Sequence, residues 1–408
     1  MPGDAPARQP GGRAAIAARL PDAPRRPSLA VLLEHLHVSG SLTRAELTAR
    51  MGVNRSTVAG LVAELVALGV AVEERPSRAS GAAGRPSLVV SSVPSRLQVV
   101  AAEVAVDNTA VALFRLGGSL TARRTAPTPH GPGSGRRIVE LLRGLVDDLG
   151  TGPDAAGVVG LGVAVPGAVR RSDGCVRFAP NLGWTDEPFG HLLAQAMPHL
   201  HVVVGNDADL GVLAEHRRGV ARGVEDVVFV SGDVGVGGGL VMGGMPLLGA
   251  GGYAGELGHM TVRPDGLPCR CGARGCWETE VGAPAIARAV SAPGQRGEEL
   301  AAAVRSARAR GRGEALAAVA HSLGVGIGNV VNLVNPQLVV LGGVLQEVLR
   351  SAGDEVRAGL DATALRAAAE QVRLALPGLG ADAVLAGAAE VVWQELLADP
   401  LPLLQATA

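Results

Sequence analysis

Residues 256–278 read ELGHMTVRPDGLPCRCGARGCWE, and this stretch gives the strongest indication of the fold. It combines one histidine with three closely spaced cysteines. Three thiolates and one imidazole match a closed tetrahedral zinc site, which has no open position for a catalytic water. Such spacing suits a metal site in a reducing compartment better than a disulfide framework. We therefore predict a structural zinc site, the alternative being no metal at all, with the ligands His259, Cys269, Cys271 and Cys276.

The same stretch resembles the signature of the ROK family, which includes transcriptional repressors and sugar kinases, and the resemblance extends over residues 28–408. It implies an α/β fold of the actin-like ATPase (sugar-kinase-like) type, in which a sugar binds between two lobes. It also implies that zinc braces the sugar-binding loop and that transcriptional members carry an N-terminal winged helix. The predicted fold class is therefore a two-lobed sugar-kinase-like domain preceded by a winged helix-turn-helix domain.

The resemblance further implies which side chains hold a sugar. In the kinases, the aspartate equivalent to Asp207 is the general base that deprotonates a sugar hydroxyl. Taken alone, an Asn-Asp pair is more typical of a helix cap, and isolated glutamates are more typical of a surface, so the assignment depends on the whole set. The predicted sugar-binding residues are Asn181, Asn206, Asp207, Glu256, His259 and Glu278.

Two segments that bind phosphate in kinases of this family are altered here. Residues 103–108 read EVAVDN, where a kinase has an aspartate followed by glycines and a threonine. Residues 232–235 read GDVG in place of Gly-Thr-Gly. Phosphate cradles need glycine because a Cβ prevents the close approach of the backbone, and a carboxylate repels ATP. We therefore predict that the protein is not an enzyme and has no catalytic residues.

Residues 28–69 have the pattern of three short helices. Thr43 and Glu46 have the spacing of a capping box at the start of the second helix. A tight turn around Gly52 follows, and Asn54 can cap the third helix. Two helices joined by a short glycine-containing turn are typical of a helix-turn-helix, whose second helix enters the major groove.

Strand-like runs at residues 70–72 and 88–90 flank a loop that we interpret as the wing. Its Gly84-Arg85-Pro86 segment can present an arginine to a narrow minor groove. The alternative is an ordinary helical hairpin whose exposed polar turn is only a cap. The predicted DNA contacts are Asn54, Arg55, Ser56, Thr57 and Arg85.

From residue 99 onward, short apolar runs alternate with glycine-rich turns and helical segments, which is typical of layered α/β structure. A chain of 408 residues with 47% hydrophobic residues can form two or three domains. The predicted division is a disordered arm at 1–26, a winged helix-turn-helix domain at 27–95, a first lobe at 96–210 and a second lobe with the zinc motif at 211–408.

The charge distribution indicates where an anionic partner binds. The net charge is −1, but arginine exceeds the acidic residues before residue 97, and the remainder is net acidic. The chain contains no lysine, so contacts to phosphates or bases are arginine contacts. No uninterrupted apolar run approaches about 18 residues, and the N-terminus lacks the apolar core of a secretory signal. We therefore predict a cytoplasmic protein without a membrane partner.

Together these features predict a sugar-responsive transcriptional regulator of carbohydrate metabolism. We expect a homodimer or dimer of dimers on operator DNA, with repression relieved by a sugar or sugar derivative. Activation, or control by a protein partner, is an alternative within the family. The rival from another class is an ATP-dependent sugar kinase that retains Asp207 as its base. A third hypothesis is a DNA-binding protein with a vestigial sugar cleft.

Overall fold

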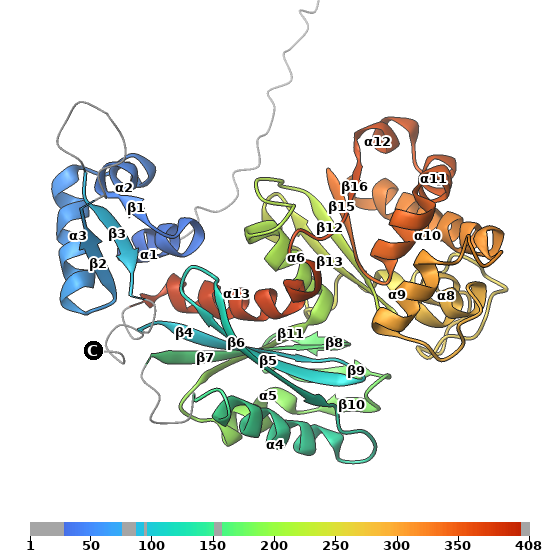
Figure 1. The fold of residues 1–408 in the computed structure, drawn as a ribbon, viewed down its shortest axis with the longest axis horizontal. Coiled ribbons are helices and arrows are strands. Elements are labelled where there is room, and N and C mark those ends of the chain that lie inside the picture. The colour runs from blue at the N-terminus through green and yellow to red at the C-terminus, as the bar shows by residue number, and fades with distance from the viewer. Residues whose placement is uncertain (1–27, 76–86, 94–95, 151–156, 401–408) are drawn as a thin grey trace, which may run out of the picture.

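The computed structural model describes residues 28–75, 87–93, 96–150 and 157–400. A small N-terminal domain is followed by two lobes, each built on a five-stranded sheet (Figure 1). This arrangement confirms the predicted fold class. The predicted arm at 1–26 lies outside the described residues.

The N-terminal domain begins with a helix-turn-helix. The predicted capping box is present, because Glu46 N–H donates to Thr43 Oγ1 at 3.1 Å and Thr43 N–H donates to Glu46 Oε2 at 2.7 Å. Gly52 then ends the second helix with a φ of 65°, a left-handed conformation that favours glycine. The helices are α1 (Ser28–Ser39), α2 (Arg44–Met51) and α3 (Arg55–Ala67).

A three-stranded antiparallel sheet with the order β1–β3–β2 completes this domain. The sequence pattern predicts two of these strands and misses β1, which is only two residues long. The loop between β2 and β3 includes Arg85 and lies outside the described residues. The strands are β1 (Leu42–Thr43), β2 (Ala71–Glu74) and β3 (Val89–Ser92).

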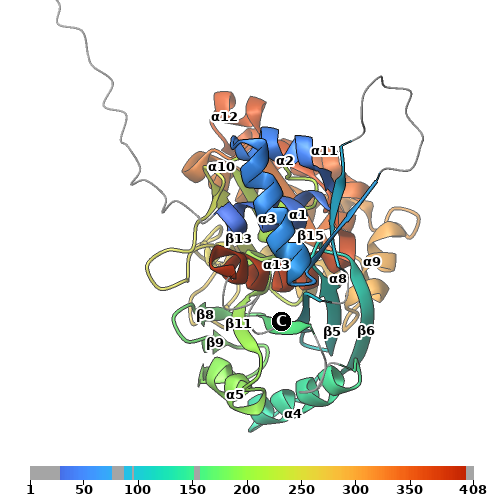
Figure 2. The ribbon, with the colours of Figure 1, turned by 90° about the vertical axis from the view of Figure 1, so that its left-hand side faces the viewer.

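The first lobe is a mixed sheet with the order β11–β7–β4–β5–β6. Helices α4 (Ser134–Asp147) and α5 (Phe189–Ala196) cover one face, and α13 (Ala383–Ala398) covers the other (Figure 1 and Figure 2). A small antiparallel sheet adjoins it, formed by β8 (Ala168–Arg170), β9 (Cys175–Ala179) and β10 (Trp184–Glu187). The main strands are β4 (Gln98–Val104), β5 (Asn108–Arg115), β6 (Leu120–Pro127), β7 (Val158–Val165) and β11 (His201–Asn206).

The second lobe is a sheet with the order β14–β13–β12–β15–β16. Along β12 the side chains alternate between two cores, as the period of a strand requires: Val228 and Val230 face one core, and Val227 and Phe229 face the other. The strands are β12 (Val227–Gly232), β13 (Val236–Met242), β14 (Met245–Pro246), β15 (Leu338–Gly343) and β16 (Arg373–Ala375).

Most helices of the second lobe lie on the side of the sheet away from the first lobe (Figure 1). One of them, α10, is long and apolar enough to cross a membrane by length and composition, but half of its most apolar window is buried within the lobe. These elements are η1 (Leu257–His259), α7 (Trp277–Val281), α8 (Ala283–Ala289), α9 (Gly297–Arg305), α10 (Gly313–Val334), α11 (Leu345–Thr363) and α12 (Arg366–Gln371).

Helices α6 (Asp207–Arg217) and α13 join the two lobes. They cross so closely that a Cβ on Gly387 would lie 1.8 Å from the carbonyl oxygen of Leu210. The turn η2 (Gly380–Asp382) leads the chain back from the second sheet into α13, which packs on the first sheet. The predicted domain boundaries remain predictions, and they did not anticipate this return of the chain to the first lobe.

Candidate functional site

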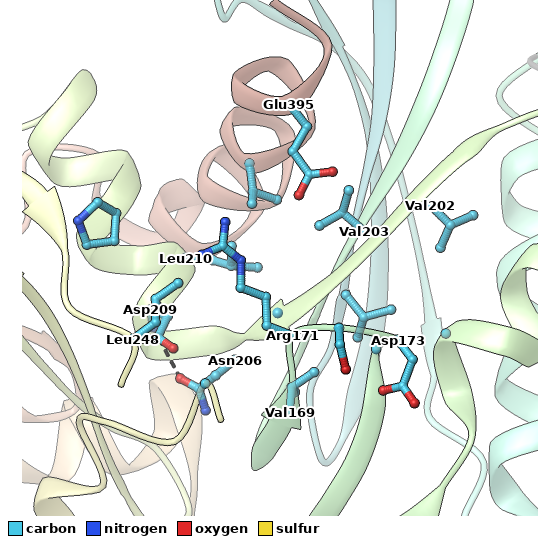
Figure 3. Close-up of a pocket in the computed structure, with 18 of the residues that line it drawn as sticks. Val169, Arg171, Asp173, Val202, Val203, Asn206, Asp209, Leu210, Leu248 and Glu395 are labelled. Atoms are coloured by element: carbon cyan, nitrogen blue, oxygen red, sulfur yellow. Dashed lines mark hydrogen bonds between the residues drawn. The ribbon is translucent and has the colours of Figure 1, made fainter. Parts of the chain in front are cut away.

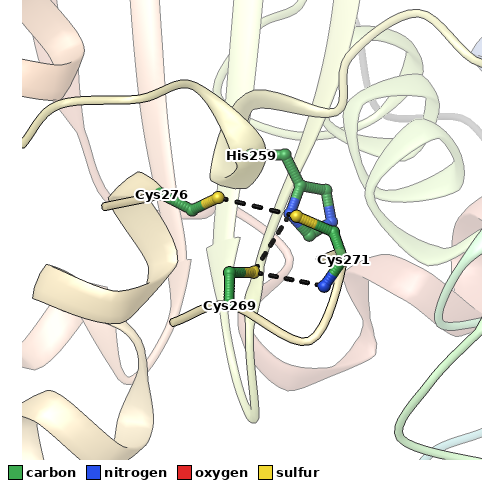
Figure 4. Close-up of side chains that lie close together, drawn as sticks. All are labelled: His259, Cys269, Cys271 and Cys276. Carbon is green, nitrogen blue, oxygen red and sulfur yellow. Dashed lines mark hydrogen bonds between the residues drawn. The ribbon is translucent and has the colours of Figure 1, made fainter. Parts of the chain in front are cut away.

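The four predicted metal ligands come together in the loop between η1 and α7 (Figure 4). Their ligand atoms all lie within 4.8 Å of one another. Cys271 Sγ lies 3.6 Å from Cys276 Sγ, and Cys269 Sγ lies 3.6 Å from His259 Nδ1. Sulfur ligands at about 2.3 Å from a tetrahedral zinc would be separated by about 3.8 Å. The cluster therefore has the donors and the spacing of a closed tetrahedral metal site.

The shape of this loop depends on one glycine and one tryptophan. Gly275 has a φ of 67°, and a Cβ there would lie 1.5 Å from the carbonyl oxygen of Arg263. Trp277 is fully buried, and its Nε1–H donates to the carbonyl of Ser322 at 3.1 Å. Its indole packs directly on Gly326 of α10. The loop is thus fixed to the second lobe at the residue that follows its last cysteine.

Two glutamates of the predicted sugar site, Glu256 and Glu278, lie next to the metal cluster. His259 Nδ1 faces the cysteines, whereas its Nε2 lies 3.9 Å from Glu256 Oε2. Glu278 Oε1 lies 2.9 Å from Cys269 Sγ and 4.0 Å from His259 Nδ1. Because its two nitrogens face different groups, a single imidazole can serve both roles predicted for His259, on the metal and on a ligand in the cleft.

Asn206 and Asp207 lie at the junction of β11 and α6. Asn206 caps the helix: its Oδ1 accepts the N–H groups of Ala208 at 2.8 Å and Asp209 at 3.1 Å, and its Nδ2 donates to Gly167 at 3.0 Å. Asp207 follows it, and burial, reinforced by nearby Asp233, raises the pKa of its carboxyl to about 7. Asn206 is therefore a helix cap, as the alternative predicts, and its role as a sugar ligand, like that of Asp207, remains a prediction.

Further carboxyls lie near Asp207, from the two segments that differ from the kinases. Burial raises the pKa of Glu103 to about 8, and the negative charges of Asp233 and Asp207 add to this effect. Burial also raises the pKa of Asp233. From the sequence, Asp233 was predicted only to repel phosphate, and Glu103 only to stand at the position of a kinase aspartate. The structure places Asp233 close enough to raise the pKa of Asp207, and Asp207 close enough to raise the pKa of Glu103.

Asn181 is connected to the metal loop across the cleft between the lobes. Arg270, which lies between two of the cysteines, donates from Nη1 to Asn181 Oδ1 at 2.6 Å. Asn181 belongs to the first lobe and Arg270 to the second, so this hydrogen bond joins the lobes at the predicted sugar site. Sequence reasoning missed Arg270, because a charged residue in a metal loop carries no signal of the partner that it will meet.

A cavity of about 530 Å³ lies next to this site, between the β8–β9 turn and helices α6 and α13 (Figure 3). Among the predicted sugar-binding residues only Asn206 lines it, so neither Asp207 nor the metal loop forms part of the cavity wall. Its other polar lining includes Arg171 and Asp209. Burial raises the pKa of Asp209 to about 8, with a contribution from Asp207. Neither residue was predicted from the sequence.

The predicted DNA contacts in the described residues gather at the start of α3. Asn54 Oδ1 accepts from Thr57 N–H at 2.8 Å, from Thr57 Oγ1–H at 2.9 Å and from Ser56 Oγ–H at 2.6 Å. These polar groups therefore also stabilise the helix end. Arg55 is exposed at the first helical position. Arg85, the predicted wing contact, is outside the described residues.

The ROK family model matches residues 99–395, which include most of both lobes. The chain belongs to the ROK family.

Individual relatives include both regulators and kinases. A putative xylose repressor of Caldicellulosiruptor sp. (strain Rt8B.4) is 29% identical over 331 residues, covering 77% of this chain and 81% of the relative. A glucokinase of Halalkalibacterium halodurans is 33% identical over 256 residues, covering 58% of this chain and 77% of the kinase. The structure of a ROK family transcriptional regulator, a homolog of the E. coli MLC protein, has a TM-score of 0.75 at 22% identity and covers 93% of this chain and 98% of that one. The similarity to regulators thus extends over more of the chain.

Proposed function

We propose that this protein is a cytoplasmic DNA-binding repressor whose affinity for its operator falls when a sugar or sugar derivative binds between the lobes. The observation that carries the proposal is the helix-turn-helix domain, with an exposed arginine at the start of α3, attached to ROK lobes. The extent of the similarity to repressors, as opposed to kinases, supports the same conclusion.

On the DNA, a dimer or dimer of dimers places two α3 helices in successive major grooves of a palindromic operator. Arg55, Ser56 and Thr57 lie on the exposed first turn, with Asn54 as its cap, and provide base or phosphate contacts. Arg85 of each wing adds a minor-groove contact. The arginine excess before residue 97 favours DNA as the partner of this part of the chain.

In the cleft, Asp207 and Glu256 accept hydrogen bonds from sugar hydroxyls, together with Glu278 and Asn181. His259 and the three cysteines would hold a zinc ion, whose closed ligand set would have the structural role of fixing the loop that leads into α7, the helix that carries Glu278. His259 Nε2 and the second N–H of the Asn206 side-chain amide provide the remaining contacts to the sugar. Sugar binding then shifts the protein toward the form with lower DNA affinity, provided that the sugar prefers that form.

The same cleft is poorly suited to phosphoryl transfer. Asp233 replaces a glycine of the kinase phosphate segment, and Val104 and Ala105 stand where the kinases have glycines. Side chains at these positions prevent a close approach of the backbone to phosphates, and an ionised Asp233 would repel ATP. A sugar kinase that uses Asp207 as its base is the second candidate function, because a glucokinase is among the relatives.

Fluorescence anisotropy tests the proposal directly. The full chain is titrated at fixed salt into labelled DNA from upstream of its own gene and neighbouring genes, with and without a panel of sugars that begins with D-xylose and D-glucose. We expect specific binding that one sugar weakens at least about tenfold. Absence of specific binding, together with ATP-dependent sugar phosphorylation in a coupled assay, would establish the kinase instead. Specific binding that no sugar changes would favour a vestigial cleft.

A further inference from the structure

The DNA-binding domain and the lobes share a hydrophobic core. Buried leucines of α1, such as Leu33 and Leu36, belong to the same cluster as Leu385 and Trp393 of α13. The ring of His37, also on α1, lies 5.4 Å from the indole of Trp393. Helix α1 is therefore packed on α13, and a change in the position of α13 changes the position of the DNA-binding domain.

A buried group of charges lies at this contact, and we call Glu34, His37, Arg217, Arg218 and Glu390 the Glu390 cluster. Glu390 Oε2 lies 3.0 Å from His37 Nε2 and accepts from Arg217 Nε–H at 3.1 Å. Arg218 donates to Glu390 Oε1 and also to the carbonyl of His37 at 3.2 Å. Arg217 in turn donates to Glu34 Oε1 at 2.6 Å. One carboxylate thus joins α1 to α6 through α13.

The cluster is shielded from water, which makes its contacts sensitive to geometry. Glu390 is 1% exposed and His37 is fully buried. Burial alone would raise the pKa of Glu390, but His37 and the two arginines outweigh it and lower this pKa to about 2. Breaking such a pair leaves an uncompensated buried charge, whereas exposed ion pairs are nearly neutral in energy. The cluster therefore favours a small number of discrete arrangements.

Helix α6 connects this cluster to the predicted sugar site. It begins at Asp207, and Arg217 and Arg218 lie at its opposite end. Eleven helical residues span about 16 Å and move as one rigid unit. The close crossing at Gly387 and Leu210 fixes α6 to α13. A displacement at the sugar-binding end is thus transmitted to the residues that hold α1.

We propose that Glu390 is a positioning residue for DNA recognition, which holds the DNA-binding domain in the orientation set by α6 and so couples sugar occupancy at Asp207 to operator affinity. This inference rests on the proposed function and deepens it. Sugar binding moves the start of α6, α13 moves with it, and α1 is reoriented because Glu390 and the two arginines hold it to these helices. The physical basis is that α6, α13 and α1 together adopt one of two arrangements. Both the sugar and the operator DNA shift the equilibrium between these arrangements.

The test is Glu390→Gln in the full chain, compared with Glu370→Gln, which removes the same charge from an exposed pair with Arg366 on α12. The readouts are the sugar Kd from calorimetry and the ratio of operator affinities without and with sugar from anisotropy. In the wild type and in Glu370→Gln we expect a ratio of at least about tenfold. In Glu390→Gln we expect a ratio below about twofold, with a sugar Kd within about twofold of the wild type.

A milder variant keeps the inference testable if Glu390→Gln does not fold. Glu34→Gln removes one of the two carboxylate partners of Arg217 and leaves Glu390 in place, and we expect it to lower the ratio to an intermediate value. If Glu390→Gln has the same ratio of operator affinities without and with sugar as the wild type, the proposed role of the Glu390 cluster is wrong. If Glu390→Gln does not fold, the same result in Glu34→Gln leads to the same conclusion. A wild-type protein whose DNA binding no sugar changes would instead contradict the proposed function, so the two failures are distinguishable.

Discussion

Helices α3 and α6 begin in the same way and face different chemical surroundings. Each is capped by an asparagine, Asn54 or Asn206, whose Oδ1 accepts a backbone N–H at 2.8 Å. After the cap, α3 continues with the exposed Arg55. Helix α6 continues with Asp207, whose pKa burial raises to about 7.

In both helices the asparagine satisfies open N–H groups of the first turn. We propose that the charged residue after it, and not the cap, makes the main contact with the ligand. An acid is favoured at a helix N-terminus by the macrodipole, whereas an arginine is disfavoured, so Arg55 is present at some expense of helix stability. A functional contact with an anion explains such a residue better than local folding does.

The largest effect should come from Asp207→Asn. Loss of the carboxylate removes charged hydrogen bonds to the sugar, and we expect the sugar to bind about tenfold to a hundredfold more weakly. Operator affinity without sugar should change by less than about twofold, because Asp207 is remote from α3. Calorimetry with the sugar and anisotropy with the operator measure the two quantities, with Glu370→Gln as the control. An unchanged sugar Kd would exclude Asp207 from the site.

Arg55→Ala tests the other helix. We expect operator affinity to fall about tenfold and, if the contact is to a phosphate, the slope of log K against log salt to decrease by about one. Arg366→Ala is the matched control, since Arg366 is exposed on α12 with 92% of its side chain accessible. Operator affinity equal to that of the wild type in Arg55→Ala would contradict the assignment of α3 as the recognition helix.

A smaller effect is expected from pH. The ionised form of Asp207 accepts more hydrogen bonds from hydroxyls than the protonated form, so raising the pH from about 6 to about 8 should strengthen sugar binding by less than about tenfold. The pKa of Glu103, about 8, lies in the same range, so Asp207→Asn is measured in parallel and should lose most of the change. Sugar binding that weakens as the pH rises would contradict this sign.

The smallest effect should come from Asn54→Ala. Removing a capping side chain lowers the free energy of unfolding by about 1 kcal/mol, and denaturant unfolding monitored by circular dichroism measures this loss. Operator affinity should change less than in Arg55→Ala, because the cap orients the first turn and Arg55 contacts the DNA. If Asn54→Ala were instead the more damaging of the two for DNA binding, Asn54 itself would be a contact.

The sequence predicts well those features that depend on local pattern. The capping box at Thr43, the cap at Asn54 and the strand at residues 158–165 follow from spacing and periodicity. The His-Cys cluster was predicted because four metal-binding side chains occur in one short stretch. By contrast, the packing of α13 on the first sheet depends on glycines such as Gly162, where a Cβ would lie 1.8 Å from the Ala388 carbonyl oxygen.

Long-range charge contacts could not be predicted either. Arg217 and Glu390 are 173 positions apart, and nothing in either local sequence indicates the other. The hydrogen bond from Arg270 to Asn181 likewise depends on how the lobes face each other. Sequence pattern therefore identifies single helix ends and ligand sets, whereas the connections between them require the three-dimensional structure.

We propose that the starts of α3 and α6 bind different ligands within one coupled molecule. The decisive experiment is one set of anisotropy titrations of operator DNA, with and without the sugar identified for the wild type, on Arg55→Ala and Asp207→Asn. We expect Arg55→Ala to weaken DNA binding while calorimetry gives an unchanged sugar Kd, and Asp207→Asn to retain DNA binding and lose the response to the sugar. If both variants lost the same function, or if Asp207→Asn responded to the sugar as the wild type does, the two helix starts would not have separate ligands.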